Sequence, residues 1–167
     1  MAMVTREDYD VFLADVRKQT GIEAITSDES GLVSVRVDEK YNVNFQFVEA
    51  TGKVLCFIEV ATLPHDAPTA VYRDLLAGGL FGKETAGGYF ALEADSETVV
   101  YNYFFDLEAA ARDVEDFIST LDKILQLCNI WEERIAAIVS AGEKPPSEIP
   151  GSPLGNFSFD QHFHIHP

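Results

Sequence analysis

Residues 75–92 read LLAGGLFGKETAGGYFAL, with five glycines and a Gly82-Lys83 pair near the centre. Glycines beside a lysine raise the question of a phosphate-binding loop, in which backbone N–H groups cradle a phosphate. The alternative is a set of tight turns between a helix and a strand, where glycine supplies backbone conformations that other residues avoid. The spacing of the glycines decides between the two.

The spacing excludes both common nucleotide-binding motifs. A Walker A loop needs Gly, four residues and then Gly-Lys-Ser/Thr, but Ala77 and Glu84 stand in the first and last places. The dinucleotide fingerprint GxGxxG fails as well, because the glycines fall at positions 78, 79 and 82 and follow a predicted helix. We therefore interpret Gly78-Gly79 as the end of that helix and Gly87-Gly88 as the entry to a strand.

On either side of this stretch, segments with the apolar spacing of a helix alternate with segments that have the spacing of a strand. Thr5 and Asp8 have the capping-box spacing of a helix that stops at Gly21, and a second, short helix starts near Pro68. A long third helix has its N-cap at Asp106 and ends at Gly142. Apolar residues alternate over strands predicted at residues 32–37, 41–47, 54–61, 89–94 and 98–105.

The element order α-β-β-β-α-β-β-α places the chain in the α+β class. Because short hairpins join the strands, we expect an antiparallel five-stranded sheet with helices mainly on one face. We predict one domain over residues 1–142. Residues 143–167 form a tail that is rich in Pro, Gly and Ser and ends in aromatic residues and histidines.

The chain of 167 residues is strongly acidic, with 28 Asp and Glu against 12 Lys and Arg and a formal charge of -16. This charge repels nucleic-acid phosphates and anionic membranes, so we expect neither as a partner. The N-terminal residues MAMVTREDYDV have no signal-peptide pattern, and we expect a cytoplasmic protein. Keeping an apolar-rich chain soluble is by itself a sufficient explanation for the charge.

Catalytic and metal-binding patterns are missing from the predicted core. HExxH and GxSxG do not occur, so we expect no enzyme and no cofactor. Cys56 and Cys128 fall in a predicted strand and a predicted helix without CxxC spacing, which indicates buried, reduced thiols. Glu93 and Asp95 flank a turn, and a solvated hairpin explains them better than an acid/base pair.

Residues 75–95 read LLAGGLFGKETAGGYFALEAD and are followed by a strand, an Asp-capped helix and Trp131 in WEERI. This pattern resembles the class I type III secretion chaperones of the Tir chaperone (CesT) family, whose signature is roughly LL-x-x-N-L-F-G-x-x-T-G-G-x-x-L-x-L. Gly79 replaces the usual Asn, and Ala86-Gly87-Gly88 loosens the Thr-Gly-Gly step. The matching residues are Leu75, Leu76, Leu80, Phe81, Gly82, Thr85, Gly88 and Leu92.

The resemblance implies a homodimeric, ATP-independent cytosolic chaperone that binds the N-terminal segment of a secreted effector in extended form and keeps it export-competent. A half-covered sheet suits such a client, because its face and edges accept apolar side chains and unpaired backbone. Two alternatives stay open: a YbjN-like interaction or regulatory domain of the same architecture without a secretion role, and an enzyme or small-ligand binder.

Three apolar residues are predicted to bind the client. Leu55 and Phe57 share a face of the sheet with polar residues of the preceding strand, and Leu32 lies on the polar side of the first strand. Burial by the tail or by a second subunit is the alternative explanation for Leu55 and Phe57. The polar residues in question are Asn42, Asn44 and Gln46.

A dimer is predicted because the strand at 98–105 is apolar on both faces, with Val100 and Phe104 opposite its tyrosines, whereas the helices of a monomer cover one face. The resemblance places the two-fold contact near the second helix and the strands after it. The alternative to a second subunit is that loops or the tail cover the second face of this strand. The interface candidates are Leu80, Phe81, Tyr101 and Tyr103.

The residues of the tail lead to two further predictions. Its apolar residues resemble those of an extended client, so we expect the tail to dock on client-type surface. Its alternating histidines leave a divalent metal site open, although exposed histidines without a second shell also bind metals adventitiously. The docking residues are Phe157, Phe159, Phe163 and Ile165, and the histidines are His162, His164 and His166.

Overall fold

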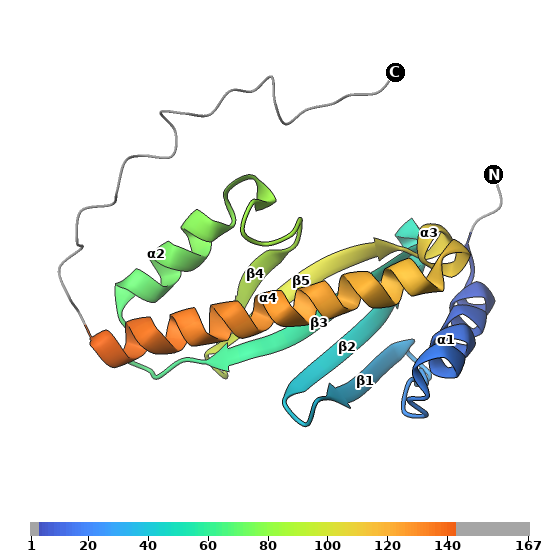
Figure 1. The fold of residues 1–167 in the computed structure, drawn as a ribbon, viewed down its shortest axis with the longest axis horizontal. Helices are drawn as coiled ribbons and strands as arrows, with labels where there is room; N and C mark the ends of the chain where they lie inside the picture. Colours follow the sequence, from blue (N-terminus) through green and yellow to red (C-terminus); the bar gives the residue numbers. More distant parts are fainter. Residues whose placement is uncertain (1–3, 143–167) are drawn as a thin grey trace, which may run out of the picture.

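The computed structural model describes residues 4–142, which contain a five-stranded antiparallel sheet (Figure 1). The order across the sheet is β1-β2-β3-β5-β4, so the third strand lies in the middle. This position explains why the third strand is apolar on both of its faces. The strands are β1 (Leu32–Val37), β2 (Tyr41–Val48), β3 (Lys53–Thr62), β4 (Tyr89–Glu93) and β5 (Thr98–Asp106).

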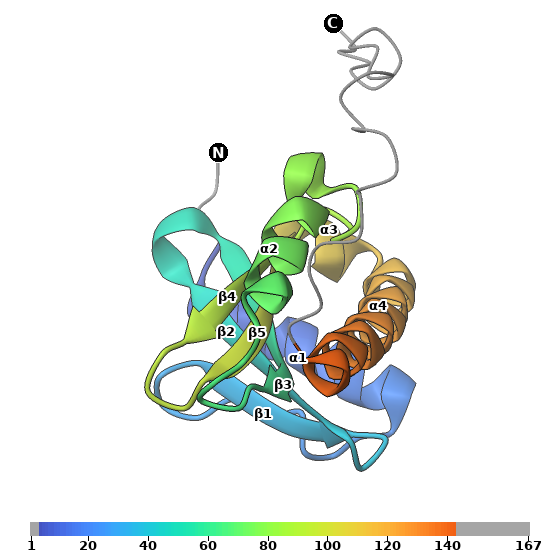
Figure 2. The ribbon, with the colours of Figure 1, turned by 90° about the vertical axis from the view of Figure 1, so that its left-hand side faces the viewer.

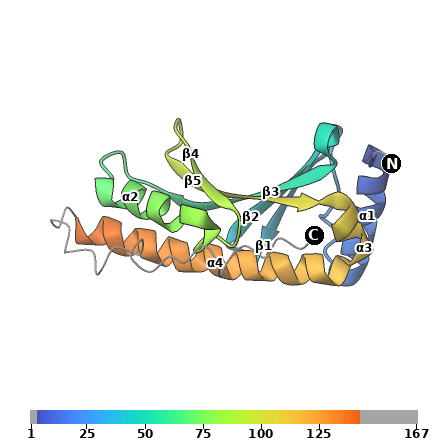
Figure 3. The same cartoon turned by 90° about the horizontal axis from the view of Figure 1, so that it is seen from above.

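The helices gather on one face of the sheet, as predicted (Figure 3). The longest helix runs along the sheet, and the first helix packs next to it over the β1–β2 side (Figure 1). Viewed end-on, α2 and α4 lie side by side (Figure 2). The helices are α1 (Arg6–Thr20), α2 (Thr69–Gly78), α3 (Leu107–Arg112) and α4 (Val114–Ala141), with short 3-10 turns at Glu49–Thr51 and Leu80–Gly82.

The predicted ends of α1 are confirmed. The Thr5 hydroxyl accepts a hydrogen bond from the Asp8 backbone N–H, and the Asp8 carboxylate accepts one from the Thr5 backbone N–H at 2.8 Å. At the other end, Gly21 has φ 70° and donates its N–H to the Arg17 carbonyl at 2.8 Å. The capping box and the left-handed glycine therefore fix both ends of α1 without tertiary contacts.

The prediction of one helix from Asp106 to Gly142 is wrong, because the chain breaks at Asp113. Asp106 caps only α3, through a 2.9 Å hydrogen bond from the Ala109 N–H to its carboxylate. Asp113 has φ -140° and ψ 81°, outside the helical region, and its carboxylate accepts the Asp116 N–H at 2.9 Å. An Asp side chain competes with the helical backbone for N–H donors, which favours a new N-cap over a continuous helix.

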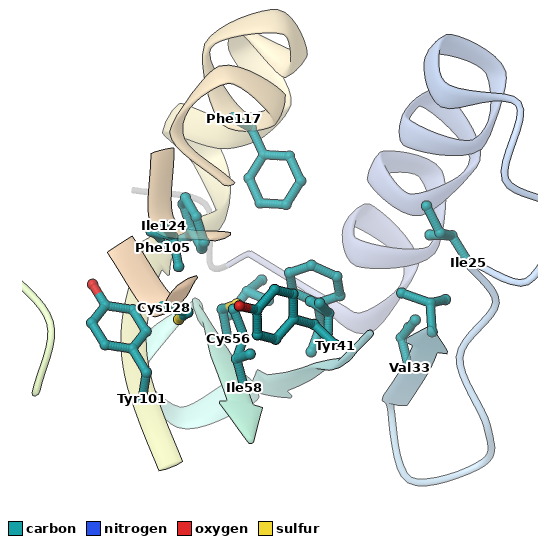
Figure 4. Close-up of a cluster of buried hydrophobic side chains, with 14 of the residues drawn as sticks. Ile25, Val33, Tyr41, Cys56, Ile58, Tyr101, Phe105, Phe117, Ile124 and Cys128 are labelled. Atoms are coloured by element: carbon teal, nitrogen blue, oxygen red, sulfur yellow. The ribbon is translucent and has the colours of Figure 1, made fainter. Parts of the chain in front are cut away.

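The core lies between the helices and the facing side of the sheet (Figure 4). Phe117, Ile124 and Cys128 of the long helix point toward strand residues that include Ile58 and Phe105. Both cysteines are free and fully buried, as the sequence predicts. Burial raises the pKa of the Cys56 thiol above its usual range and that of Cys128 to about 12, so both stay protonated and unreactive at neutral pH.

The glycine-rich stretch is held in place by Trp131 of α4. The Trp131 indole N–H donates to the Glu84 carbonyl at 3.0 Å, and its ring occupies the space that a side chain at position 78 would need. The Arg134 guanidinium lies 4.4 Å from the centre of the same ring and pairs with Asp74 of α2 at 2.5 Å and with Glu84 at 2.9 Å. One residue pair of α4 therefore fixes both α2 and the loop that follows it.

A second set of hydrogen bonds ties the loop to β5. The buried Thr85 donates its hydroxyl to the Gly88 carbonyl at 2.7 Å, and its own carbonyl accepts the Tyr101 hydroxyl at 2.7 Å. Backbone N–H groups of the loop, including those of Gly82 and Gly87, donate to carbonyls inside the loop. These hydrogen bonds shape the loop as a series of tight turns, in agreement with the interpretation of its glycines as turn residues.

We predict that Gly78→Ala lowers the free energy of unfolding by about 1–3 kcal/mol, because the new Cβ overlaps the Trp131 ring. Gly79→Ala is the matched control. Gly79 has φ -73°, and a Cβ there meets nothing closer than a backbone oxygen at 3.5 Å, so Ala at this position should raise stability by about 0.4–1 kcal/mol. Urea unfolding measures both variants, and equal effects at the two positions would contradict the proposed role of Trp131.

Candidate protein-binding site

One face of the sheet, which we call the outer face, carries no helix within residues 4–142 (Figure 3). Its side chains alternate along each strand with those of the core. The strand register arranges them in rows across the sheet. The first row is Leu32, Gln46, Leu55 and Phe104; the second is Ser34, Asn44, Phe57, Asn102 and Tyr89; the third holds Arg36, Asn42, Glu59, Val100 and Ala91.

The three predicted client-binding residues all lie on this face, and each is half-buried. Leu32 and Leu55 sit in the same row, separated by Gln46, and Phe57 follows Leu55 on β3. The structure adds Phe104, which is 43% exposed directly opposite Leu55. An apolar patch therefore crosses β3 and β5 on the outer face.

Tyr89 and Val100 enlarge the same patch, and the sequence analysis missed them as client-binding candidates. Tyr89 is exposed opposite Asn102, and Val100 is half-buried two residues before Asn102 on β5. The alternation in 98–105 did place Val100 and Phe104 on this face. The alternation did not reveal that β5 pairs with β3, and this pairing brings Val100 and Phe104 next to Leu55 and Phe57.

The polar half of the outer face, over β1 and β2, is tied up by its own hydrogen bonds. The Asn44 side chain accepts the Ser34 hydroxyl at 2.6 Å and donates to the Phe57 carbonyl at 3.3 Å. The Asn42 amide donates to the Glu59 carboxylate at 3.0 Å. These bonds hold the polar side chains in place, so the face offers a fixed surface that is apolar on one side and polar on the other.

A second exposed apolar surface lies between α2 and β4. Leu76 of α2 is 79% exposed, and Leu80 after the helix and Leu92 of β4 are also exposed. Leu76 and Leu92, with their neighbours, line a groove of about 190 Å³, which we call the α2–β4 groove. Its lining residues are Tyr72, Leu75, Leu76, Phe90, Ala91, Leu92 and Val99.

The four predicted interface residues fall in different places. Leu80 and Phe81 are exposed near the α2–β4 groove, and Tyr103 is half-buried on the helix-covered side of β5. Tyr101 is 0% exposed, and its hydroxyl is bonded to the Thr85 carbonyl. Its assignment to a dimer interface is therefore corrected: Tyr101 is a core residue, because the only partner its hydroxyl needs lies inside the protomer.

Among residues 4–142, no group of three His, Cys, Asp or Glu side chains is placed to hold a metal ion. In the same part of the chain, no helix is long and apolar enough to cross a membrane. The predicted docking residues and histidines of the tail lie outside the described residues. They are Phe157, Phe159, Phe163 and Ile165, and His162, His164 and His166.

A partly apolar sheet face that no helix of residues 4–142 covers, together with a separate apolar groove, is typical of a protein-interaction domain. The sequence profile of the Tir chaperone protein (CesT) family matches residues 12–132. The chain therefore belongs to this family, as its glycine-rich stretch predicts. No curated protein sequence matches the chain.

Solved structures share the fold at low sequence identity. A chain of the ExsC–ExsE complex has 18% identity and a TM-score of 0.64, with 85% of this chain and 100% of that chain covered. A chain of the HopA1–SchA chaperone–effector complex has 20% identity and a TM-score of 0.62, with 75% and 94% covered. A chain of the ExoU–SpcU complex of the Pseudomonas aeruginosa type III secretion system has 17% identity and a TM-score of 0.54, with 80% and 98% covered.

Proposed function

We propose that this protein is a non-enzymatic, ATP-independent chaperone of the cytosol that binds the N-terminal segment of a type III secreted effector and keeps it export-competent. Membership of the CesT family over residues 12–132 is the observation that carries this proposal. Chains of similar fold occur in a chaperone–effector complex and in a complex of a type III secretion system. The comparisons lend no support to the alternative of a regulatory domain without a secretion role.

The outer face suits an unfolded client on physical grounds. A segment that has not folded exposes apolar side chains, and burial of each large one contributes about 1.5–3 kcal/mol. The patch of Leu55, Phe57, Phe104 and Tyr89 offers several such contacts on a sheet that is already formed. Binding of this kind needs no nucleotide, because the hydrophobic effect supplies the free energy and ordering of the client opposes it.

Co-expression with N-terminal segments of the proteins encoded beside this gene tests the proposal. We expect one segment to form a soluble complex with the wild-type chain. The combined substitution Leu55→Asp and Phe57→Asp should weaken that complex by about a hundredfold or more, because two apolar contacts are lost and charges are placed in the patch. Isothermal titration measures the affinity.

The matched control for this experiment places the same charges elsewhere. Val11 of α1 and Ile130 of α4 are exposed apolar residues on the helical side of the protein. Val11→Asp with Ile130→Asp should therefore leave the client affinity unchanged. Unchanged capture by the Leu55→Asp and Phe57→Asp variant, with its circular dichroism intact, would show that the outer face is not the client site.

We also propose that the chain forms a homodimer through the α2–β4 groove. Leu76 lines the groove and is exposed, Leu80 is exposed two residues after the end of α2, and a second copy of this surface would cover them. Leu76→Asp with Leu80→Asp should raise the dimer dissociation constant more than about a hundredfold and leave the fold intact. Light scattering at micromolar concentration checks this, and a monomeric wild-type chain would defeat the proposal.

The tail gives a third proposal: that its apolar residues, such as Phe157 and Phe163, compete with the client for the outer face. They alternate with polar residues as in an extended client segment. Removing residues 150–167 should therefore tighten client binding several-fold, because a tail that occupies the outer face lowers the fraction of the protein that is free to bind the client. If neither client affinity nor the binding of a hydrophobic dye changes on deletion, the tail takes no part in binding.

A further inference from the structure

Asn102 lies at the centre of the apolar half of the outer face. It is paired with Phe57 of β3 on one side and with Tyr89 of β4 on the other. Along β5, Val100 lies two residues before it and Phe104 two residues after it. Only 9% of Asn102 is exposed. Its amide is thus surrounded by the side chains that we assign to client binding.

The hydrogen-bonding capacity of the Asn102 side chain is largely unused. Its Nδ2 donates to the Val100 carbonyl of the same strand at 3.2 Å. Within the described part of the chain its Oδ1 accepts no hydrogen bond from another residue. An amide in an apolar patch with an open acceptor depends on water for its remaining hydrogen bonds.

Asn44 shows what a satisfied amide looks like at the same depth. It lies in the same row as Asn102, on the other side of Phe57, and is also 9% exposed. Its Oδ1 accepts the Ser34 hydroxyl at 2.6 Å, and its Nδ2 donates to the Phe57 carbonyl at 3.3 Å. Asn44 therefore stabilises the sheet, whereas the single hydrogen bond of Asn102 joins no two elements.

Local structure gives no reason for an asparagine at position 102. Asn is a poor strand former, and a β-branched or aromatic residue would suit the middle of β5 and its apolar neighbours better. A residue that breaks a local rule without a structural gain is the kind expected at a binding site. The open acceptor points to the partner that would supply the gain.

We infer that Asn102 is a hydrogen-bonding anchor for the main chain of the bound client, an inference that rests on the proposed chaperone function. When an extended segment covers the patch, it displaces water from Asn102, and an acceptor left unpaired there would oppose binding. A main-chain N–H of the segment satisfies the Oδ1 whatever the client sequence is. The fitting partner is an extended polypeptide with apolar side chains on both sides of one exposed N–H.

A library of phage-displayed random 12-residue peptides provides a defined probe. Peptides are selected on the wild-type chain, and those that still bind the Phe57→Asp variant are discarded, so that the rest require the outer face. Each remaining peptide is then synthesised with single N-methyl groups along its backbone, which remove one N–H at a time. Fluorescence anisotropy gives the affinities for the wild type, Asn102→Leu and Asn44→Leu.

We expect one N-methyl position in each peptide to weaken wild-type binding about tenfold, the size of one hydrogen bond whose loss leaves an unpaired group. The same position should have no effect with Asn102→Leu, which itself should bind the unmodified peptides about tenfold more weakly despite its larger apolar surface. Asn44→Leu should lower the midpoint of thermal unfolding and keep the N-methyl effect.

The inference is overturned if no N-methyl position weakens binding to the wild type, a result that does not depend on the folding of any variant. It is also overturned if Asn102→Leu binds the peptides as tightly as the wild type or more tightly. The Asn102 amide would then contribute no hydrogen bond to peptide binding. Both of these outcomes leave the client site in place. Failure to select any peptide that requires Phe57 would overturn the client site together with the anchor.

Discussion

The contact between Trp131 and Gly78 is the constraint on which the rest of the structure depends. The indole ring fits against α2 only because residue 78 has no side chain, and its N–H holds the Glu84 carbonyl. Arg134, stacked on the same ring, adds ion pairs to Asp74 and Glu84. These contacts hold α4 and α2 together on one side of the sheet, and within residues 4–142 no helix covers the apolar residues of the other side (Figure 3).

The residues that define the family and the residues proposed to bind the client are therefore separate. Of the matching residues in the stretch 75–92, Thr85 and Gly88 make close contacts inside the protomer, and Thr85 holds the start of β4 against Tyr101. The patch on the outer face comes mainly from β3 and β5, at residues such as Phe57 and Phe104. A chain can keep the first set for its fold and vary the second for its client, because the two sets lie on opposite sides of the sheet.

Local rules predicted the elements well and their long-range pairing poorly. The period of two correctly set Leu55 and Phe57 apart from the core residues of β3, because alternation along a strand is independent of its neighbours. It did not show that β5 lies between β3 and β4, since that pairing joins residues far apart in sequence. Tyr101 was misplaced for the same reason: its ring packs against Phe90 and its hydroxyl donates to the Thr85 carbonyl, and no periodicity reveals these contacts.

The two proposed surfaces meet at β4, a strand of five residues at the edge of the sheet. Phe90 and Leu92 line the α2–β4 groove, Tyr89 belongs to a row of the outer face, and Ala91 belongs to both surfaces. A second subunit in the groove would hold β4 from one side, and a client on the outer face would hold it from the other. Both proposed partners would therefore contact the same short edge strand from its two faces, so β4 is the element through which a second subunit and a client would meet.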